Sequence, residues 1–165
     1  MKEMEKSSVY KDFVIILLQM NFNNIIAWVG GFSFFAFLST LIREIIKDVE
    51  DYKGDEAYGR NTLPIVLGIR ATKVTLIVLI LFLVFCLGYI YVTQLSTKPG
   101  GERDLLTLSW FVLFLVLPLI YLIFRLIAAS DKGDYHFCSN FTKGIMLAGI
   151  LYSVIFYTIL HPYIP

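Results

Sequence analysis

The sequence predicts an all-α membrane protein, built as a polytopic bundle of helices. Hydrophobic residues make up 58% of its 165 residues, charged residues make up 16%, and the mean hydropathy is +0.74. Soluble domains are about 45–50% apolar and about 25% charged, so a water-soluble globule is excluded. Several uncharged runs also reach the roughly 20 residues that a helix needs to cross a bilayer. We expect residues 1–165 to form a single membrane domain.

Four apolar segments are the expected membrane spans, at about 24–46, 74–94, 105–125 and 144–160. The first belongs to an uncharged run from Phe13 to Ile42. Either that run is one long tilted helix, or a new helix begins near Asn23, because Asn is a favourable N-cap residue. The third span contains Pro118, which tends to kink a helix. We expect the polar segment 128–143 to be a loop.

The distribution of Lys and Arg indicates the orientation of the chain. Nine of the 14 basic residues fall in the segments 43–73 and 125–143, and five fall in the other polar segments. Four alternating spans put those two segments on the same side, and basic loops stay in the cytoplasm. We therefore expect residues 43–64 to face the cytoplasm from a bacterial inner membrane. The sequence has no basic stripe that would indicate a nucleic-acid partner.

The charged segment, residues 43–64, lies between two apolar segments of membrane length. Charge next to hydrocarbon is costly, so ionisable residues there are candidates for function. Four carboxylates spaced four, three and four residues apart fall on one stripe if the first helix continues. They are Glu44, Asp48, Asp51 and Asp55. Because Gly54 weakens a helix, we expect Asp55 to lie in a loop just past the last turn.

Like charges on one stripe repel one another, and a bound cation would relieve that repulsion. Hard divalent cations prefer oxygen ligands, and Mg²⁺ in particular is bound by one or two carboxylates together with substrate phosphates. The pattern therefore favours a Mg²⁺ site. The alternative from composition alone is a solvated loop of mixed charge.

The string around these carboxylates resembles a known motif. It reads Asp51-x-x-x-Asp55, preceded by Arg43-Glu44-x-x-Lys47-Asp48 and followed by Gly59-x-x-Thr62-Leu63-Pro64 and Leu67-Gly68. This pattern is similar to the second aspartate-rich motif of the UbiA family of intramembrane prenyltransferases, especially members of the geranylgeranylglyceryl-phosphate synthase type. One position departs from the family. Asn61 stands where a basic residue usually precedes the Thr, and Arg60 is basic one place earlier.

The resemblance implies a reaction in which an isoprenyl diphosphate binds with Mg²⁺, the diphosphate leaves, and the allylic cation alkylates a small acceptor. Asp51 and Asp55 are then the catalytic carboxylates, since carboxylates can engage a diphosphate only through a metal. Asp48 is a further metal ligand, or it orients Lys47. Four bases are expected to bind the diphosphate oxygens: Arg43, Lys47, Lys53 and Arg60. The acceptor stays open between a glycerol phosphate ether, a quinone-ring precursor and a tetrapyrrole.

The resemblance also implies that the chain carries only part of the fold. Family members have about nine spans, and their first aspartate-rich motif, Asn-x-x-x-Asp-x-x-x-Asp, has no match here. The order of features matches the last four spans. We therefore expect the N-terminal half of the same fold to be a missing partner, and we expect the chain alone to be inactive.

The rival reading is a non-catalytic membrane scaffold of four spans, or half of a transporter. A transporter usually carries polar or charged residues near the bilayer midplane, whereas the segments 74–94 and 105–124 carry almost none. The charges lie at a helix end instead, which favours the enzyme. For the lone histidine of the polar segment, His136, we expect a surface role, with a proton acceptor as the alternative.

Overall fold

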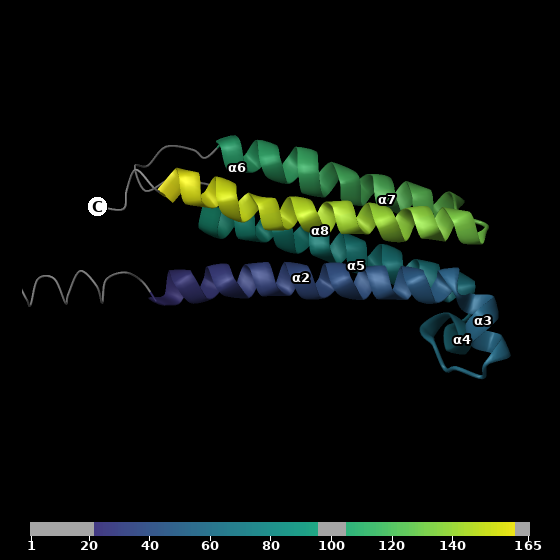
Figure 1. Cartoon of the computed structure of the whole chain (residues 1–165). Coiled ribbons are helices and arrows are strands. Elements are labelled where there is room, and N and C mark those ends of the chain that lie inside the picture. The colour runs from purple at the N-terminus through teal and green to yellow at the C-terminus, as the bar shows by residue number, and fades with distance from the viewer. Residues whose placement is uncertain (1–21, 96–104, 161–165) are drawn as a thin grey trace, which may run out of the picture. The chain divides into compact units, whose positions relative to one another are not determined.

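The computed structural model describes residues 22–95 and 105–160, which form helices and no strand (Figure 1). The long helices are α2 (Phe22–Glu50), α5 (Ile69–Ile90) and α8 (Lys132–Leu160). The shorter ones are α3 (Tyr52–Ala57), α4 (Leu63–Leu67), α6 (Leu105–Trp110) and α7 (Leu117–Ala128). Two π-helical stretches, η1 (Tyr91–Leu95) and η2 (Phe111–Val116), extend α5 and join α6 to α7. The predicted all-α class is confirmed.

Three helical stretches among the described residues are long and apolar enough to cross a membrane. They are Val29–Glu50, Ile69–Thr93 and Leu105–Ala128, and they overlap the first three expected spans. The fourth expected span, 144–160, stays a prediction. The third stretch changes from π-helical to α-helical winding just before Pro118, whose ring removes one backbone donor. The beginning of the uncharged run, residues 13–21, lies outside the described residues.

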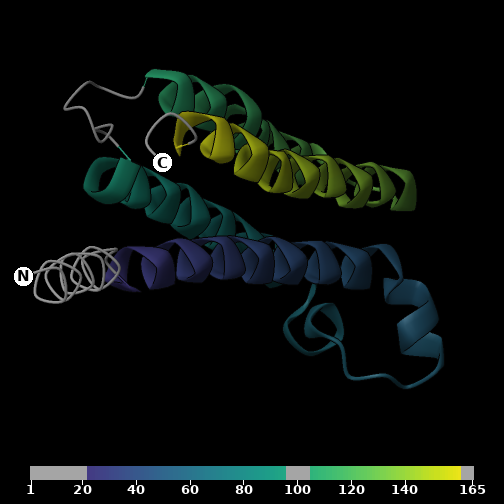
Figure 2. The ribbon, with the colours of Figure 1, turned by 60° about the vertical axis from the view of Figure 1, so that its left-hand side comes forward.

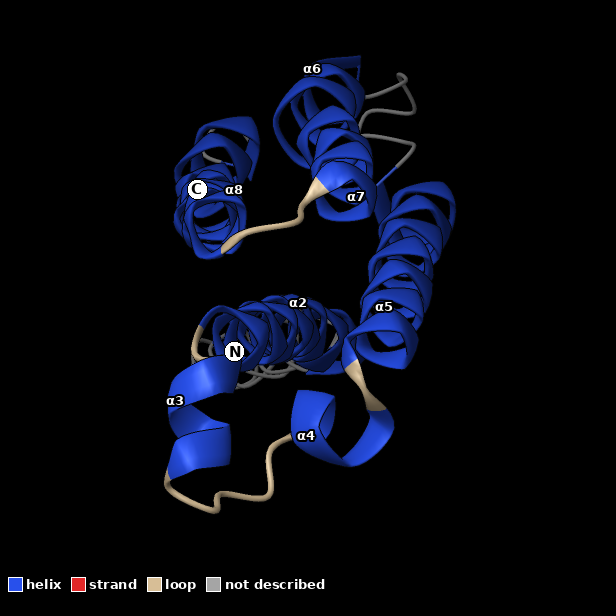
Figure 3. Cartoon of the chain, turned by 90° about the vertical axis from the view of Figure 1, so that its right-hand side faces the viewer, coloured by secondary structure: helices blue, strands red, loops and turns tan. Residues whose placement is uncertain are grey.

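The helices pack within a compact unit that begins at Phe35. In this unit α7 contacts both α5 and α8, and the end-on view of Figure 3 shows these helices with the last part of α2. The buried side chains of α5 recur every three or four residues, as one face of a helix requires: Thr72, Leu76, Ile80, Leu83 and Leu87. The opposite faces carry exposed apolar side chains such as Phe85, which is 70% exposed. Apolar side chains both inside and outside fit a bundle surrounded by lipid.

Helices α2 and α8 approach each other closely at Gly149. A β-carbon built on this glycine would lie 2.8 Å from Cζ of Phe35, closer than real side chains pack. The Phe35 ring is rigid and Phe35 is buried, so it has little room to move aside. Small residues at helix interfaces permit such close approach in membranes. The position therefore requires glycine for packing.

The turn between α7 and α8 is short and capped by two aspartates. Asp131 Oδ1 accepts a hydrogen bond from the backbone N–H of Asp134 at 2.9 Å. The Asp134 carboxylate in turn accepts the N–H of Asp131 at 3.5 Å, which gives the reciprocal pattern of a capping box, and it also accepts the N–H of Ser130 at 2.9 Å. The expectation of a loop over 128–143 is therefore wrong, because α8 already begins at Lys132. The spacing Asp131-x-x-Asp134 was the overlooked signal.

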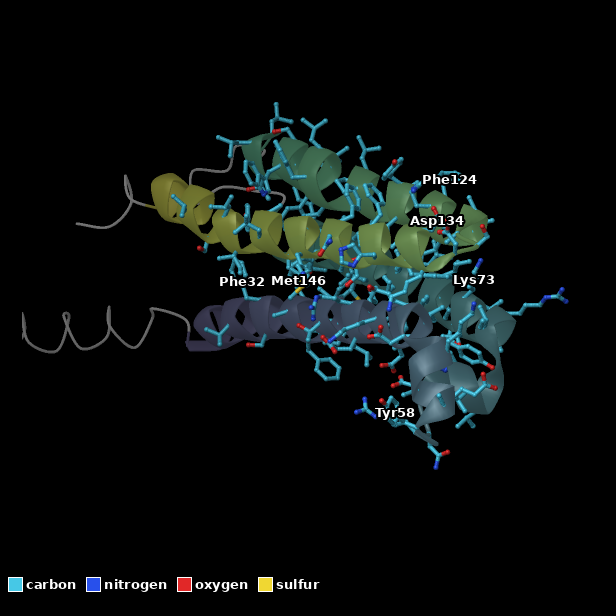
Figure 4. The ribbon with its side chains drawn as sticks, turned by 45° about the vertical axis from the view of Figure 1, so that its right-hand side comes forward. Phe32, Tyr58, Lys73, Phe124, Asp134 and Met146 are labelled. Carbon is cyan, nitrogen blue, oxygen red and sulfur yellow. The ribbon has the colours of Figure 1, made fainter. Side chains whose placement is uncertain are left out.

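Lys73, at the start of α5, forms hydrogen bonds to the same turn between α7 and α8. Its ammonium donates to the carbonyl oxygen of Ala129 at 2.6 Å and to that of Ile127 at 3.5 Å. Carbonyls at a helix C-terminus have no partner within the helix, so the ammonium satisfies them. The ammonium also lies 5.7 Å from the centre of the Tyr135 ring. The ends of α5, α7 and α8 thus meet at one end of the bundle, where Figure 4 labels Lys73 and Asp134.

Replacing Gly149 with alanine should lower the thermal unfolding midpoint of the chain in detergent micelles. Overpacking a filled interface costs about 1–3 kcal/mol. Gly144→Ala on the same helix is the matched control, because a β-carbon there meets no atom within 4 Å. Alanine also favours helix over glycine by about 1 kcal/mol, so the control should melt at or above the wild-type midpoint. Equal midpoints for the two variants would contradict the close approach.

The capping box should make stability depend on pH in the acid range. The hydrogen bond from the Ser130 N–H, assisted by Asp131 and Arg125, lowers the pKa of Asp134 below its ordinary 3.8. A lowered folded-state pKa gives stability that is present above the unfolded-state pKa and is lost as the pH falls through the folded value. Wild type should therefore melt above Asp134→Ala at neutral pH, and the gap should close only below about pH 4. A gap that stays constant down to about pH 2 would refute this role.

Candidate active site

The charged segment begins on α2 and continues into α3 through a bend at Asp51. Helix α2 runs to Glu50, which leaves Asp48 in its last turn. Asp51 has φ −95° and ψ 8°, values that interrupt the regular helix. Asp55 then lies within α3, so the expectation that it follows the helix in a loop is wrong. Gly54 is an interior residue of α3 rather than a helix terminator.

The stretch from α3 to α5 contains two glycines with positive φ. Gly59, between α3 and α4, has a φ of +67°, and Gly68, between α4 and α5, has a φ of +84°, conformations that glycine adopts without strain. Figure 2 shows α3 turning away from the end of α2 and the connection leading to α4. This path brings Arg60 back onto Asp55. The Arg60 N–H donates to the Asp55 carbonyl at 2.9 Å, and its guanidinium NH1 lies 3.4 Å from Asp55 Oδ1.

Asp55 is the most enclosed of the predicted metal ligands, with 8% of its surface exposed. A buried carboxylate needs a charge partner or several hydrogen bonds, and here Arg60 supplies the charge. Arg60 itself is exposed, so its guanidinium is free to turn toward an incoming anion. Although Asn61 stands where the family usually has a base, the neighbouring Arg60 therefore still contacts a predicted metal ligand.

Asp51 is paired by a residue from the far end of the sequence. Lys132, in the first turn of α8, donates to Asp51 Oδ1 at 3.2 Å across 81 residues. The neighbouring Glu50 lies 2.9 Å from Nδ1 of His136, which is on the next turn of α8. The first turns of α8 thus lie beside the charged segment and contact two of its carboxylates. The segments 43–73 and 125–143 lie at the same end of the bundle, as the orientation argument requires.

The four expected diphosphate-binding bases differ in their surroundings. Arg43 forms an ion pair with the adjacent Glu44, and its Nε is buried without a hydrogen-bond partner among the described residues. Lys47 and Lys53 are exposed on α2 and α3. These bases therefore lie on three successive pieces of the chain, two on α2, one on α3 and Arg60 after it. A diphosphate above the aspartates would have donors available from each piece.

The electrostatics of the aspartates favour a cation. The carboxylates of Asp55, Glu44 and Asp51 all repel that of Asp48, and only Lys47 nearby opposes them. Within the described ranges, no three potential ligands are close enough to hold a metal ion by themselves. The donor chemistry nevertheless fits Mg²⁺, which takes one or two carboxylates and completes its shell with substrate phosphate and water. Asp51 and Asp55 are the carboxylates whose present partners, Lys132 and Arg60, are exposed bases.

Sequence reasoning missed the contribution of α8. Lys132, His136 and Asn140 follow one another at intervals of four residues, which places them on one face of a helix. That spacing indicates a helix with these three side chains on one face. It was overlooked because the segment was expected to be a loop.

Comparison with known proteins identifies relatives over most of the chain. The chain is similar to digeranylgeranylglyceryl phosphate synthase of Methanosphaera stadtmanae, with 29% identity over 128 residues, covering 73% of this chain and 42% of the relative. It is similar to the enzyme of the same name from Methanopyrus kandleri, with 33% identity over 118 residues, covering 70% and 39%. A shorter stretch of 41 residues is 56% identical to the Methanothermobacter thermautotrophicus protein of that name, covering 25% and 15%.

The chain thus spans less than half the length of the curated relatives it matches. No solved structure matches it. A sequence model of the UbiA prenyltransferase family matches residues 13–145, which include the whole charged segment and the first turns of α8. Since that match covers most of the sequence, the chain belongs to the UbiA prenyltransferase family.

Proposed function

We propose that this chain supplies the second aspartate-rich half of an active site that transfers a prenyl group from an isoprenyl diphosphate to a small acceptor within the membrane. One observation carries the proposal. Asp51 and Asp55 lie at the charged end of an apolar bundle, and the base that pairs with each of them, Lys132 or Arg60, is exposed. Such a pair can exchange its bases for a metal ion, and the bases can then bind the phosphate that the metal brings.

The residues have distinct roles in this proposal. Asp51 and Asp55 hold Mg²⁺, with Asp48 as the third carboxylate. When bound, Mg²⁺ supplies Lewis-acid neutralisation of the leaving diphosphate. Arg60 and Arg43 pair with phosphate oxygens through their planar guanidinium groups, and Lys47 and Lys53 act as point charges. The apolar side chains of the bundle keep water away from the allylic cation.

The names of the relatives favour one of the acceptors that the sequence left open. They are synthases of a digeranylgeranylglyceryl phosphate, a glyceryl phosphate that carries two prenyl groups. We propose that the acceptor of this chain is likewise a glyceryl phosphate with a free hydroxyl. The new bond then forms at an oxygen atom, so a proton must leave that hydroxyl during transfer.

The site needs further parts of the fold for turnover. We propose that the missing spans supply the first aspartate-rich motif, because the matched relatives are more than twice as long as the aligned region. We also propose that the charged segment faces the cytoplasm from the inner membrane. The contact between Lys132 and Asp51 supports this orientation, since it joins the two most basic segments at one end of the bundle.

The direct test is a chimera in which this chain replaces the aligned region of the Methanosphaera stadtmanae relative. Transfer from a radiolabelled prenyl diphosphate is measured with Mg²⁺ in membranes. Asp51→Asn combined with Asp55→Asn should lower the rate at least about 100-fold, because even residues that only hydrogen-bond to a metal ligand are worth about 10–100-fold. Glu56→Gln, on the exposed side of α3, is the matched control and should retain the rate. An inactive parent chimera, or an unchanged rate in the double variant, would favour a scaffold instead.

The purified chain alone should show no prenyl transfer under the same conditions. Its two carboxylates supply only part of the ligands that the Mg²⁺–diphosphate complex needs, so the substrate would bind weakly. Measurable turnover by the isolated chain would contradict the need for the other half of the site.

A further inference from the structure

A directed chain of hydrogen bonds links α8 to the end of α2. The Lys143 ammonium donates to Asn140 Oδ1 at 2.8 Å. An ammonium can only donate, so the amide oxygen of Asn140 faces Lys143 and its NH₂ faces the other way. That NH₂ lies 2.9 Å from His136 Nε2. His136 Nδ1 lies 2.9 Å from Glu50 Oε1.

These contacts fix the protonation of a neutral His136 ring. The Glu50 carboxylate can only accept, so the proton is on Nδ1. Nε2 then carries the lone pair and accepts from Asn140. The Glu50 side chain is 13% exposed whereas that of His136 is 63% exposed. A carboxylate held in place thus orients an accessible imidazole whose basic nitrogen is Nε2, an arrangement suited to proton abstraction.

The imidazole also lies beside the predicted metal and diphosphate site. Glu50 directly precedes Asp51 in the chain. Lys132, which binds Asp51, is four residues before His136 on the same face of α8, a separation of about 5–6 Å between β-carbons. An acceptor hydroxyl directed at a prenyl carbon over Asp51 would therefore come within reach of His136.

We propose that His136 is the general base that accepts the proton of the acceptor hydroxyl, with Glu50 as the residue that positions it. This inference rests on the proposed function. The acceptor oxygen forms a bond to C1 of the prenyl group, and the C1–O bond to the diphosphate breaks with its electron pair leaving on the diphosphate. The hydroxyl proton passes to His136 Nε2, and Glu50 stabilises the resulting imidazolium. Asn140 and the acceptor hydroxyl donate to the same lone pair, so Asn140 holds the ring until the acceptor replaces it.

The kinetic test uses the chimera with glyceryl phosphate acceptor. His136→Ala should lower kcat about 100-fold or more, the usual contribution of a general base, with the KM for prenyl diphosphate changed less than about twofold. Added imidazole should restore part of the rate, which a merely structural loss would not allow. The matched control is His161→Gln, at the other of the two histidines, which should leave kcat unchanged. A wild-type kcat for His136→Ala overturns the proposal.

A second measurement needs no turnover and uses the full chain in micelles. In the His161→Gln background, ring-¹⁵N spectra report His136 alone, and in the neutral form of the ring they should show a protonated Nδ1 and an unprotonated Nε2. Glu50→Ala should shift the ring toward the opposite tautomer. A proton on Nε2 in the parent, or no response to Glu50→Ala, overturns the proposed orientation.

The two proposals fail in different ways. Activity that survives in His136→Ala but is lost in the Asp51→Asn, Asp55→Asn double variant rules out His136 as the base and leaves the prenyltransferase proposal standing. Activity that survives in both variants rules out the proposed metal site as well.

Discussion

Carboxylates at the edge of a hydrocarbon layer must be neutralised, and this requirement organises the charged end of the bundle. Asp55 is nearly buried and takes Arg60 from the connection that follows α3. Asp51 takes Lys132 from α8. The first pair is local, whereas the second joins distant parts of the chain, so the contact that offsets the charge of Asp51 also holds α8 against the end of α2. The paired bases are exposed, and exposed ion pairs are weak, which makes them easy to exchange.

In the proposed function, a metal–diphosphate complex would offer a cation to the aspartates and anionic oxygens to the bases. Each charge that loses its present partner would then gain another. The exposed apolar faces of α5 and α7 suit a lipid surrounding, because lipid needs no polar contacts. His136 belongs to the same end of the bundle but to a separate hydrogen-bond chain. In the proposed mechanism it would therefore act on the acceptor without breaking the contact between Lys132 and Asp51.

The all-α membrane class could be predicted because it depends on local features of the sequence, whereas the role of the aspartates stays a prediction. Apolar length determines the spans, and the spacing of Asp51 and Asp55 within the motif identifies the candidate site. The roles of Lys132 and His136 depend instead on contacts across 81 and 86 residues, which composition and periodicity do not report. Overlooking the capping box at Asp131 added to this, because without it the first turns of α8 were expected to be a loop. The need for glycine at 149 likewise depends on where Phe35 lies.

The most direct measurement is a crystal structure of the chimera with Mg²⁺ and an unreactive thiolodiphosphate analogue of the substrate. The account predicts a metal ion bridging the carboxylates of Asp51 and Asp55 to the diphosphate, with the Lys132 ammonium moved from Asp51 onto a phosphate oxygen. Bound diphosphate located elsewhere, with Asp51 and Lys132 still paired and no metal between the aspartates, would contradict it.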